Sequence, residues 1–124
     1  MRHNPQRYFR SILRAGCKDG TTHFFLSSGS GEELNALWAK LQRRFPTLQI
    51  AGMYAASGKP FSEQEEHTIC QMVSDAKADV LWVGLDQAKE WMLAHQAEMP
   101  HCVMIGIEGG LGFLLDAVSG FWLR

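Results

Sequence analysis

The chain has 124 residues, of which 46% are hydrophobic and 20% are charged, and its formal net charge is −1. These values predict one folded domain of ordinary size over residues 1–124, and they exclude a disordered tail and a generally basic nucleic-acid-binding protein. Membrane-spanning helices need about 20 consecutive apolar residues, and no run in the sequence approaches that length. The basic N-terminus also lacks the apolar stretch of a secretory signal.

Residues 1–20 are predicted to form a basic amphipathic helix. Its basic side would carry Arg7, Arg10, Arg14 and Lys18. Its apolar side would carry Phe9, Ile12, Leu13 and Cys17. Such a helix either presents a solvated charged face or makes peripheral contact with an anionic membrane.

Four apolar runs rich in β-branched and aromatic residues follow, and each precedes a stretch of helical period. The runs cover residues 22–28, 48–54, 79–85 and 101–107. Their apolar residues are nearly continuous, which is typical of strands buried on both faces. Strand–helix alternation at this spacing predicts four βα units over residues 22–108 and a parallel sheet, for which we expect the strand order 2-1-3-4.

The intervening helices begin at capping residues and carry apolar stripes. In the first, Ser30 and Glu33 form a capping box, and the stripe is Leu34, Leu37, Trp38, Leu41 and Phe45. In the second, Ser62 and Glu65 form the box, and the stripe is Ile69, Met72, Val73 and Ala76. In the third, over residues 87–98, Asp86 is the predicted N-cap, and the inward residues are Ala88, Trp91, Met92 and His95.

These elements predict an α/β fold: a three-layer Rossmann-like domain with a four-stranded parallel sheet and helices on both faces. Residues 109–124 are apolar and would form a C-terminal helix or a tail that a partner covers. Because large exposed apolar surfaces usually mark interfaces, we expect a homo-oligomer, in the form of a symmetric dimer.

Ligands of open α/β sheets bind at the carboxyl ends of the strands, so the loops there are the candidate sites. The glycines at positions 29 and 31 match no phosphate-loop pattern, which favours a turn and a helix cap over a phosphate site. Glu108, Gly109 and Gly110 follow the fourth strand directly, and they form either a ligand-binding turn or a solvated one.

Metal and disulfide chemistry find little support in the spacing of residues along the chain. The five histidines show no HxxxH or CxxH pattern, so we expect no metal site. Three scattered cysteines, Cys17, Cys70 and Cys102, make neither a CxxC pair nor an even set for disulfides. We therefore expect a cytoplasmic protein in which each cysteine is a small buried hydrophobe.

Several segments together resemble the later part of the WecG/TagA/CpsF family of bacterial glycosyltransferases. The family's "FLLGG" strand corresponds to Phe24–Ser28, and its "L…RYPxLxIxGxxxGYF" segment to Leu41–Phe61. Its "ADILFVGLGxPKQExWM…H…LP" segment matches Ala78–Pro100, and its "VxIGVGGxFDFLAG" segment matches Val103–Ala117. The resemblance implies transfer of N-acetylmannosamine or a related sugar from a UDP donor to a lipid-linked acceptor in surface-polymer synthesis.

The resemblance also places the candidate substrate-binding residues. They are Gly84, Asp86, Lys89, Glu90, Glu108, Gly109 and Gly110. The PKQE segment that helps members of the family to hold the nucleotide sugar is shortened here, with Lys89 and Glu90 as its remnants. No residue of this chain matches the family's proposed catalytic Asp, which lies in an upstream PDG-like motif, so no catalytic residue is assigned.

Two hypotheses follow. In the first, the chain is a truncated or divergent glycosyltransferase domain that keeps part of a UDP-sugar pocket, needs no cofactor, and is not catalytically complete alone. In the second, it is a non-enzymatic α/β interaction module that self-associates or binds a protein partner. Neither hypothesis includes a nucleic-acid partner.

Overall fold

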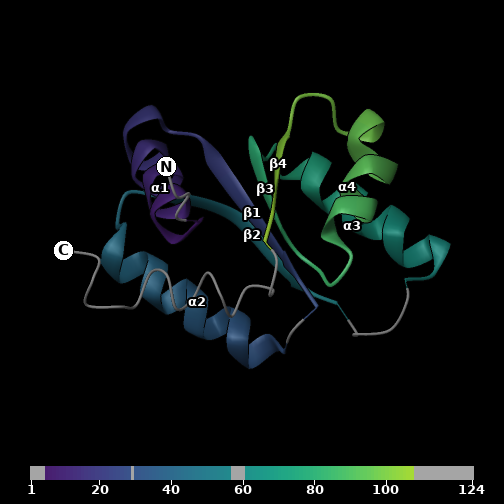
Figure 1. The fold of residues 1–124 in the computed structure, drawn as a ribbon, viewed down its shortest axis with the longest axis horizontal. Coiled ribbons are helices and arrows are strands. Elements are labelled where there is room, and N and C mark those ends of the chain that lie inside the picture. Colours follow the sequence, from purple (N-terminus) through teal and green to yellow (C-terminus); the bar gives the residue numbers. More distant parts are fainter. Residues whose placement is uncertain (1–4, 29, 57–60, 108–124) are drawn as a thin grey trace.

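The computed structural model describes residues 5–28, 30–56 and 61–107. After an N-terminal helix, strands and helices alternate along the chain (Figure 1). The elements are α1 (Pro5–Asp19), β1 (Thr22–Ser27), α2 (Gly31–Arg44), β2 (Gln49–Ala55), α3 (Glu63–Asp75), β3 (Val80–Gly84), α4 (Ala88–His95), the 3₁₀ helix η1 (Gln96–Glu98) and β4 (Val103–Gly106). Among these residues no helix combines the length and the apolar character that crossing a bilayer requires.

The four strands form one parallel sheet in the order β2-β1-β3-β4, which confirms the predicted order. In the central pair, His23 lies opposite Val80 and Ser27 lies opposite Gly84. Because all strands run in the same direction, their carboxyl ends meet at one edge of the sheet. That edge is where a ligand of an open α/β sheet is expected.

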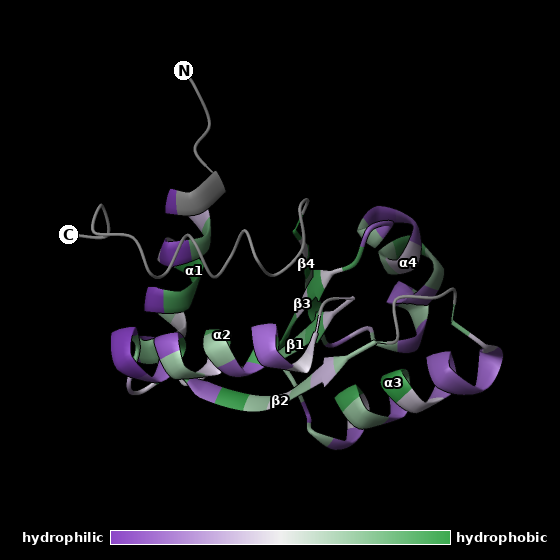
Figure 2. Ribbon diagram, turned by 90° about the horizontal axis from the view of Figure 1, so that it is seen from below, coloured by the Kyte–Doolittle hydropathy of each residue, from purple (hydrophilic) through white to green (hydrophobic). Residues whose placement is uncertain are grey.

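Helices cover both faces of the sheet, as predicted (Figure 1). On one face Phe25 and Trp82 pack against α1 and α2. On the other face Phe24 and Leu81 pack against α3 and α4. In Figure 2 each helix carries both hydrophilic and hydrophobic residues, as amphipathic helices do, whereas strand β3 is hydrophobic. The sequence is thus arranged in three layers, with two hydrophobic clusters separated by the sheet.

Only the central strands are buried as predicted. Every residue of β3 and all but the first of β1 are buried, whereas β2 and β4 are only partly buried. The prediction that all four strands are covered on both faces was therefore wrong for two of them. The predicted order 2-1-3-4 placed these two strands at the edges of the sheet, so their continuous apolar runs alone are not evidence of cover on both faces.

Two residues of the predicted stripes also face solvent. Trp38 on α2 is 41% exposed and Met72 on α3 is 37% exposed. Both lie at the margin of their stripe, beside the fully buried Leu37 and Ile69. A helix with a stripe of this width turns its marginal side chains partly away from the sheet.

A polar pair is buried on the α1 side of the sheet. Trp82 Nε1–H donates a hydrogen bond to His23 Nδ1 at 2.9 Å, and both residues are 0% exposed. Since Nδ1 accepts, Nε2 carries the ring proton and donates to Thr21 Oγ1, 3.0 Å away. A Cβ atom at Gly16 would lie only 2.6 Å from Nε2, so glycine allows α1 to cross closely above this ring.

The His23 ring makes stability dependent on pH. Burial lowers the pKa of His23 below its ordinary value, although the charges of Asp19 and Asp79 act to raise it. The folded state therefore keeps the ring neutral while the unfolded chain takes up a proton as the pH falls below about 6.5. The unfolded state then binds more protons, so the free energy of unfolding falls as the pH falls.

We expect the free energy of unfolding to decrease by up to about 1.4 kcal/mol per pH unit below pH 6.5, as measured by urea denaturation. His23→Gln, which keeps an acceptor for Trp82, should be less stable at pH 7 and should lose this slope between pH 6.5 and 5.5. His101→Gln, at an exposed position, should keep it. An unchanged slope in His23→Gln would contradict the assignment.

Candidate functional site

An open cleft of about 530 Å³ lies at the carboxyl ends of β1 and β3. Its walls come from the loop after each of these strands, from the start of α3 and from α4. The described lining residues are Ser28, Phe61, Glu66, Leu85, Asp86, Gln87, Glu90, Trp91, Ala94 and His95. The cleft therefore lies at the edge of the sheet that the sequence pointed to.

Backbone contacts hold the two strand ends together beneath the cleft. The N–H and the hydroxyl of Ser28 both donate to the carbonyl oxygen of Gly84, at 3.2 and 3.4 Å. Ser27, the residue before, lies opposite Gly84 in the sheet. Gly84 thus positions the loop that follows β3 and is not itself among the lining residues.

The first turn of α4 lies at the cleft and has no side-chain cap. Its N-cap residue is Gln87, and no side chain of the described residues accepts a hydrogen bond there. The prediction that Asp86 caps this helix was wrong. By contrast, α2 and α3 are capped as predicted, since Ser30 Oγ accepts from the backbone N–H of Glu33 and Ser62 Oγ from that of Glu65.

An uncapped first turn has consequences for ligand binding. Backbone N–H groups at the start of a helix carry partial positive charge and attract anions. Three carboxylates on the cleft wall, those of Glu66, Asp86 and Glu90, act against this attraction. The cleft therefore combines donors for an anion with acceptors for hydroxyl groups.

Apart from Gly84, the residues predicted for substrate binding divide into three groups. Asp86 and Glu90 line the cleft. Lys89 is exposed on the same turn of α4 but is not a lining residue. Glu108, Gly109 and Gly110, together with the apolar segment 109–124, lie outside the described residues.

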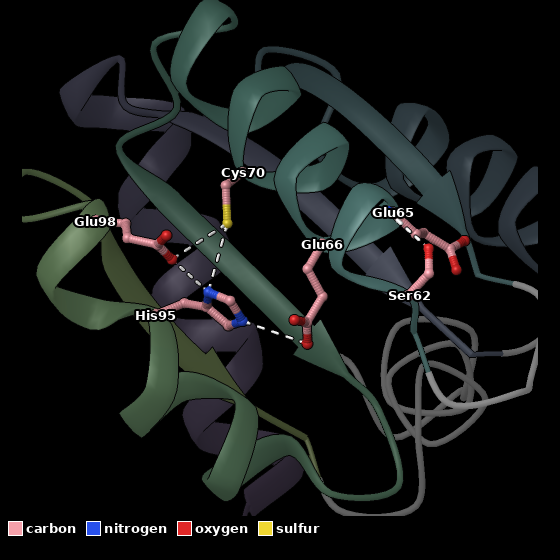
Figure 3. Close-up of polar contacts among 6 residues, drawn as sticks. All are labelled: Ser62, Glu65, Glu66, Cys70, His95 and Glu98. Atoms are coloured by element: carbon pink, nitrogen blue, oxygen red, sulfur yellow. Dashed lines mark hydrogen bonds and ion pairs between the residues drawn. The ribbon is translucent and has the colours of Figure 1, made fainter.

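A polar cluster that the sequence did not predict centres on His95 (Figure 3). His95 Nδ1 faces Cys70 Sγ at 3.6 Å and hydrogen bonds to Glu98 Oε2. On the other side of the ring, Nε2 lies 3.5 Å from Glu66 Oε1. Glu66 and Cys70 belong to α3, His95 ends α4 and Glu98 ends η1, so the cluster joins elements distant in sequence.

The cluster perturbs two of its own titratable groups. The hydrogen bond with His95 is the largest cause of a lowered pKa at the Glu98 carboxyl group. Burial, followed by the charge of Glu98, raises the pKa of the Cys70 thiol to about 11. All three cysteines are only partly buried, which corrects the prediction that each is a small buried hydrophobe. The inward position predicted for His95 is confirmed.

Trp91 forms part of the cleft wall and is 7% exposed. Its ring lies against that of His95, with 4.5 Å between the ring centroids. The Nε1–H group is buried and has no hydrogen-bond acceptor among the described residues. A buried donor without an acceptor costs stability in the folded state.

The fold and the cleft define an α/β protein with an open cleft at the carboxyl ends of a parallel sheet. The model of the "Glycosyl transferase WecG/TagA/CpsF family" matches residues 1–120, and the chain belongs to that family. This confirms the resemblance found in the sequence.

Among curated proteins, the chain is similar to the N-acetylglucosaminyldiphosphoundecaprenol N-acetyl-beta-D-mannosaminyltransferases of Staphylococcus aureus strains NCTC 8325 / PS 47, COL and MRSA252. In each comparison the identity is 27% over 89 residues, which cover 70% of this chain and 33% of the relative. The chain thus spans about a third of the length of the curated relatives it matches.

The two buried tryptophans provide a test of the unsatisfied donor. Trp91→Phe keeps most of the ring and removes a donor without an acceptor, so we expect the free energy of unfolding to change by less than about 1 kcal/mol. Trp82→Phe leaves His23 Nδ1 without its partner inside the core and should cost about 1–3 kcal/mol more. Urea denaturation at pH 7.5 measures both values. A larger loss in Trp91→Phe than in Trp82→Phe would show that Trp91 Nε1 has an acceptor in the folded protein.

Proposed function

We propose that the chain is a divergent WecG/TagA/CpsF glycosyltransferase domain whose cleft binds a nucleotide sugar of the UDP type, and that these 124 residues alone do not transfer the sugar. One observation carries the proposal. The segment Ala78–Pro100, one of those that resemble the family, supplies most of the described residues that line the cleft.

The names of the relatives indicate the class of reaction. They describe transfer of an N-acetylmannosaminyl group to N-acetylglucosamine linked through a diphosphate to undecaprenol. The family resemblance implies that UDP carries the sugar that is transferred. A UDP-sugar combines a diphosphate with several hydroxyl groups, and this combination suits a cleft with an uncapped helix start beside three carboxylates.

The charges of the cleft limit the affinity. Backbone N–H groups of the first turn of α4 favour the diphosphate, and the exposed Lys89 adds a point charge nearby in sequence. Asp86 and Glu90 repel the phosphate groups from the same turn. We therefore expect a dissociation constant no tighter than about 1 mM for UDP and for its sugar conjugates.

Transfer requires a group that activates the acceptor hydroxyl and groups that stabilise the departing UDP. The resemblance places the catalytic Asp of the family in a segment for which these 124 residues show no counterpart. The carboxylates of the cleft belong instead to the donor site in this proposal. Binding without transfer is therefore the expected behaviour of the chain when it is tested alone.

The predictions about assembly and surroundings belong to the same proposal. Arg14 and Lys18 are exposed on α1, which supports peripheral contact of its basic face with an anionic membrane. Such a contact suits an acceptor that is anchored in lipid. Self-association through residues 109–124 and a cytoplasmic location stay predictions.

Titration of the ¹⁵N-labelled chain with UDP tests nucleotide binding. We expect saturable amide shifts confined to residues 84–91 and to Ser28, Glu66 and residues 108–110, with half-saturation at about 1 mM or above. Lys89→Ala should raise the dissociation constant about two- to fivefold, because an exposed charge contributes modestly. Absence of localised shifts at 10 mM UDP would favour the interaction-module hypothesis.

Charge variants test whether the cleft binds the phosphate groups. Asp86→Asn combined with Glu90→Gln removes two negative charges from the cleft wall and should tighten UDP binding about three- to tenfold. Asp75→Asn, the matched control at the far end of α3, should leave the affinity unchanged. The gain should shrink at high salt, as expected for screened charges. An equal UDP affinity in the double variant and in Asp75→Asn would mean that the phosphate groups do not bind beside Asp86 and Glu90.

A further inference from the structure

We propose that Cys70, His95 and Glu98 bind a Zn²⁺ ion that links α3 to the end of α4. The proposal is independent of nucleotide binding, and it departs from the expectation of no metal site, which rested only on spacing along the chain. Each of the three residues offers one ligand atom, and these atoms all lie within 4.8 Å of one another. Figure 3 shows the Cys70 side chain pointing from α3 toward the side chains of His95, at the end of α4, and Glu98, in η1.

The distances fit tetrahedral zinc. Cys70 Sγ lies 3.6 Å from His95 Nδ1 and 3.6 Å from Glu98 Oε2. Zn²⁺ binds sulfur at about 2.3 Å and nitrogen or oxygen at about 2.1 Å, so two such ligands at the tetrahedral angle are about 3.6 Å apart. Both distances that involve the thiol therefore already match those of a zinc site.

One ligand must move. Glu98 hydrogen bonds directly to His95 Nδ1, whereas two zinc ligands of these types lie about 3.4 Å apart. The Glu98 side chain is 55% exposed, so its carboxylate can swing away from the ring without disturbing the core. Water supplies the fourth ligand, as in other zinc sites with three protein ligands.

The surroundings of His95 also suit a metal ligand. Histidines that bind zinc commonly direct their second ring nitrogen at a carboxylate, which fixes the ring and raises its basicity. Here Glu66 Oε1 lies 3.5 Å from Nε2, while Nδ1 faces the other two ligands. The ring is 11% exposed at the side chain and is held against Trp91, so its orientation is set before any ion binds.

The ligand set selects among ions. One thiolate, one imidazole and one carboxylate form the mixed sulfur, nitrogen and oxygen set that suits Zn²⁺, and it does not suit Mg²⁺ or Ca²⁺. Binding forms three bonds to the ion. It releases the thiol proton of Cys70 to solvent, together with the Nδ1 proton where the ring carries one.

The experiment uses the full chain, stripped with a chelator and kept under a reductant that binds no metal. Zn²⁺ at about 100 times its dissociation constant should raise the melting temperature by about 10 °C for a chain of this size. Titration should saturate at one ion per chain. Co²⁺ in place of Zn²⁺ should give the visible bands of a tetrahedral site and a near-ultraviolet band from the thiolate.

Variants assign the ligands. Cys70→Ser should abolish the thiolate band and weaken Zn²⁺ binding by at least about 100-fold. Glu98→Gln, which keeps a polar partner for His95 at an exposed position, should weaken it about 10- to 100-fold, and Glu66→Gln by about tenfold. Cys102→Ser is the matched control, because this thiol is also partly buried but points at the carbonyl oxygen of Val103. It should leave the band and the affinity unchanged.

The outcomes separate this site from the nucleotide site. No change in melting temperature with Zn²⁺, or a thiolate band that persists in Cys70→Ser, would overturn the proposal. If Cys70→Ser does not fold, an unchanged Zn²⁺ affinity in Glu98→Gln would overturn it as well. UDP titrations in the presence of a chelator test the proposed function separately, because the chelator removes the ion while His95, the proposed zinc ligand that also lines the cleft, stays in place.

Discussion

A hydrogen bond inside the sheet constrains much of this molecule. Trp82 Nε1 and His23 Nδ1 are buried in an otherwise apolar layer, and each satisfies the other. This pairing depends on the observed register of β1 and β3, since a shift of one strand by one residue would place the two side chains on opposite faces of the sheet. The same register brings Ser28 to Gly84 at the other end of the strands, where their contacts form the base of the cleft.

The cleft owes its chemical character to the way in which α4 begins. In α2 and α3 the N-cap is a serine whose hydroxyl oxygen accepts a hydrogen bond from a backbone N–H group. In α4 the N-cap is Gln87, and no side chain of the described residues makes such a contact. Asp86 and Glu90 line the cleft beside this uncapped helix start. This combination favours ligands that are partly anionic and partly rich in hydroxyl groups over simple anions.

The sequence predicted what depends on local periodicity and not what depends on the assembled fold. The serine caps and the inward position of His95 follow from patterns within one element, and the strand order was expected from the alternation of strands and helices along the chain. Burial of β2 and β4 was overestimated: the predicted order already placed both at the edges, and a nearly continuous apolar run does not by itself require cover on both faces. The cluster of Cys70 with His95 was missed because 25 residues separate them and because each, taken alone, reads as a core residue. Only the packing of α3 against α4 makes them neighbours.

His95 belongs to both sites, and this has a physical cause. A buried imidazole needs a partner at each nitrogen, and a position between two helices supplies partners from both sides. Nε2 faces Glu66 on the cleft wall, while Nδ1 faces Cys70 and Glu98 behind it. The contacts of Cys70 and Glu98 with Nδ1 therefore fix the ring that Glu66 contacts at the cleft. The His95 ring lies against Trp91 at an interplanar angle of 40°, so Cys70 and Glu98, which are not among the described lining residues, contact a ring that forms part of the cleft wall.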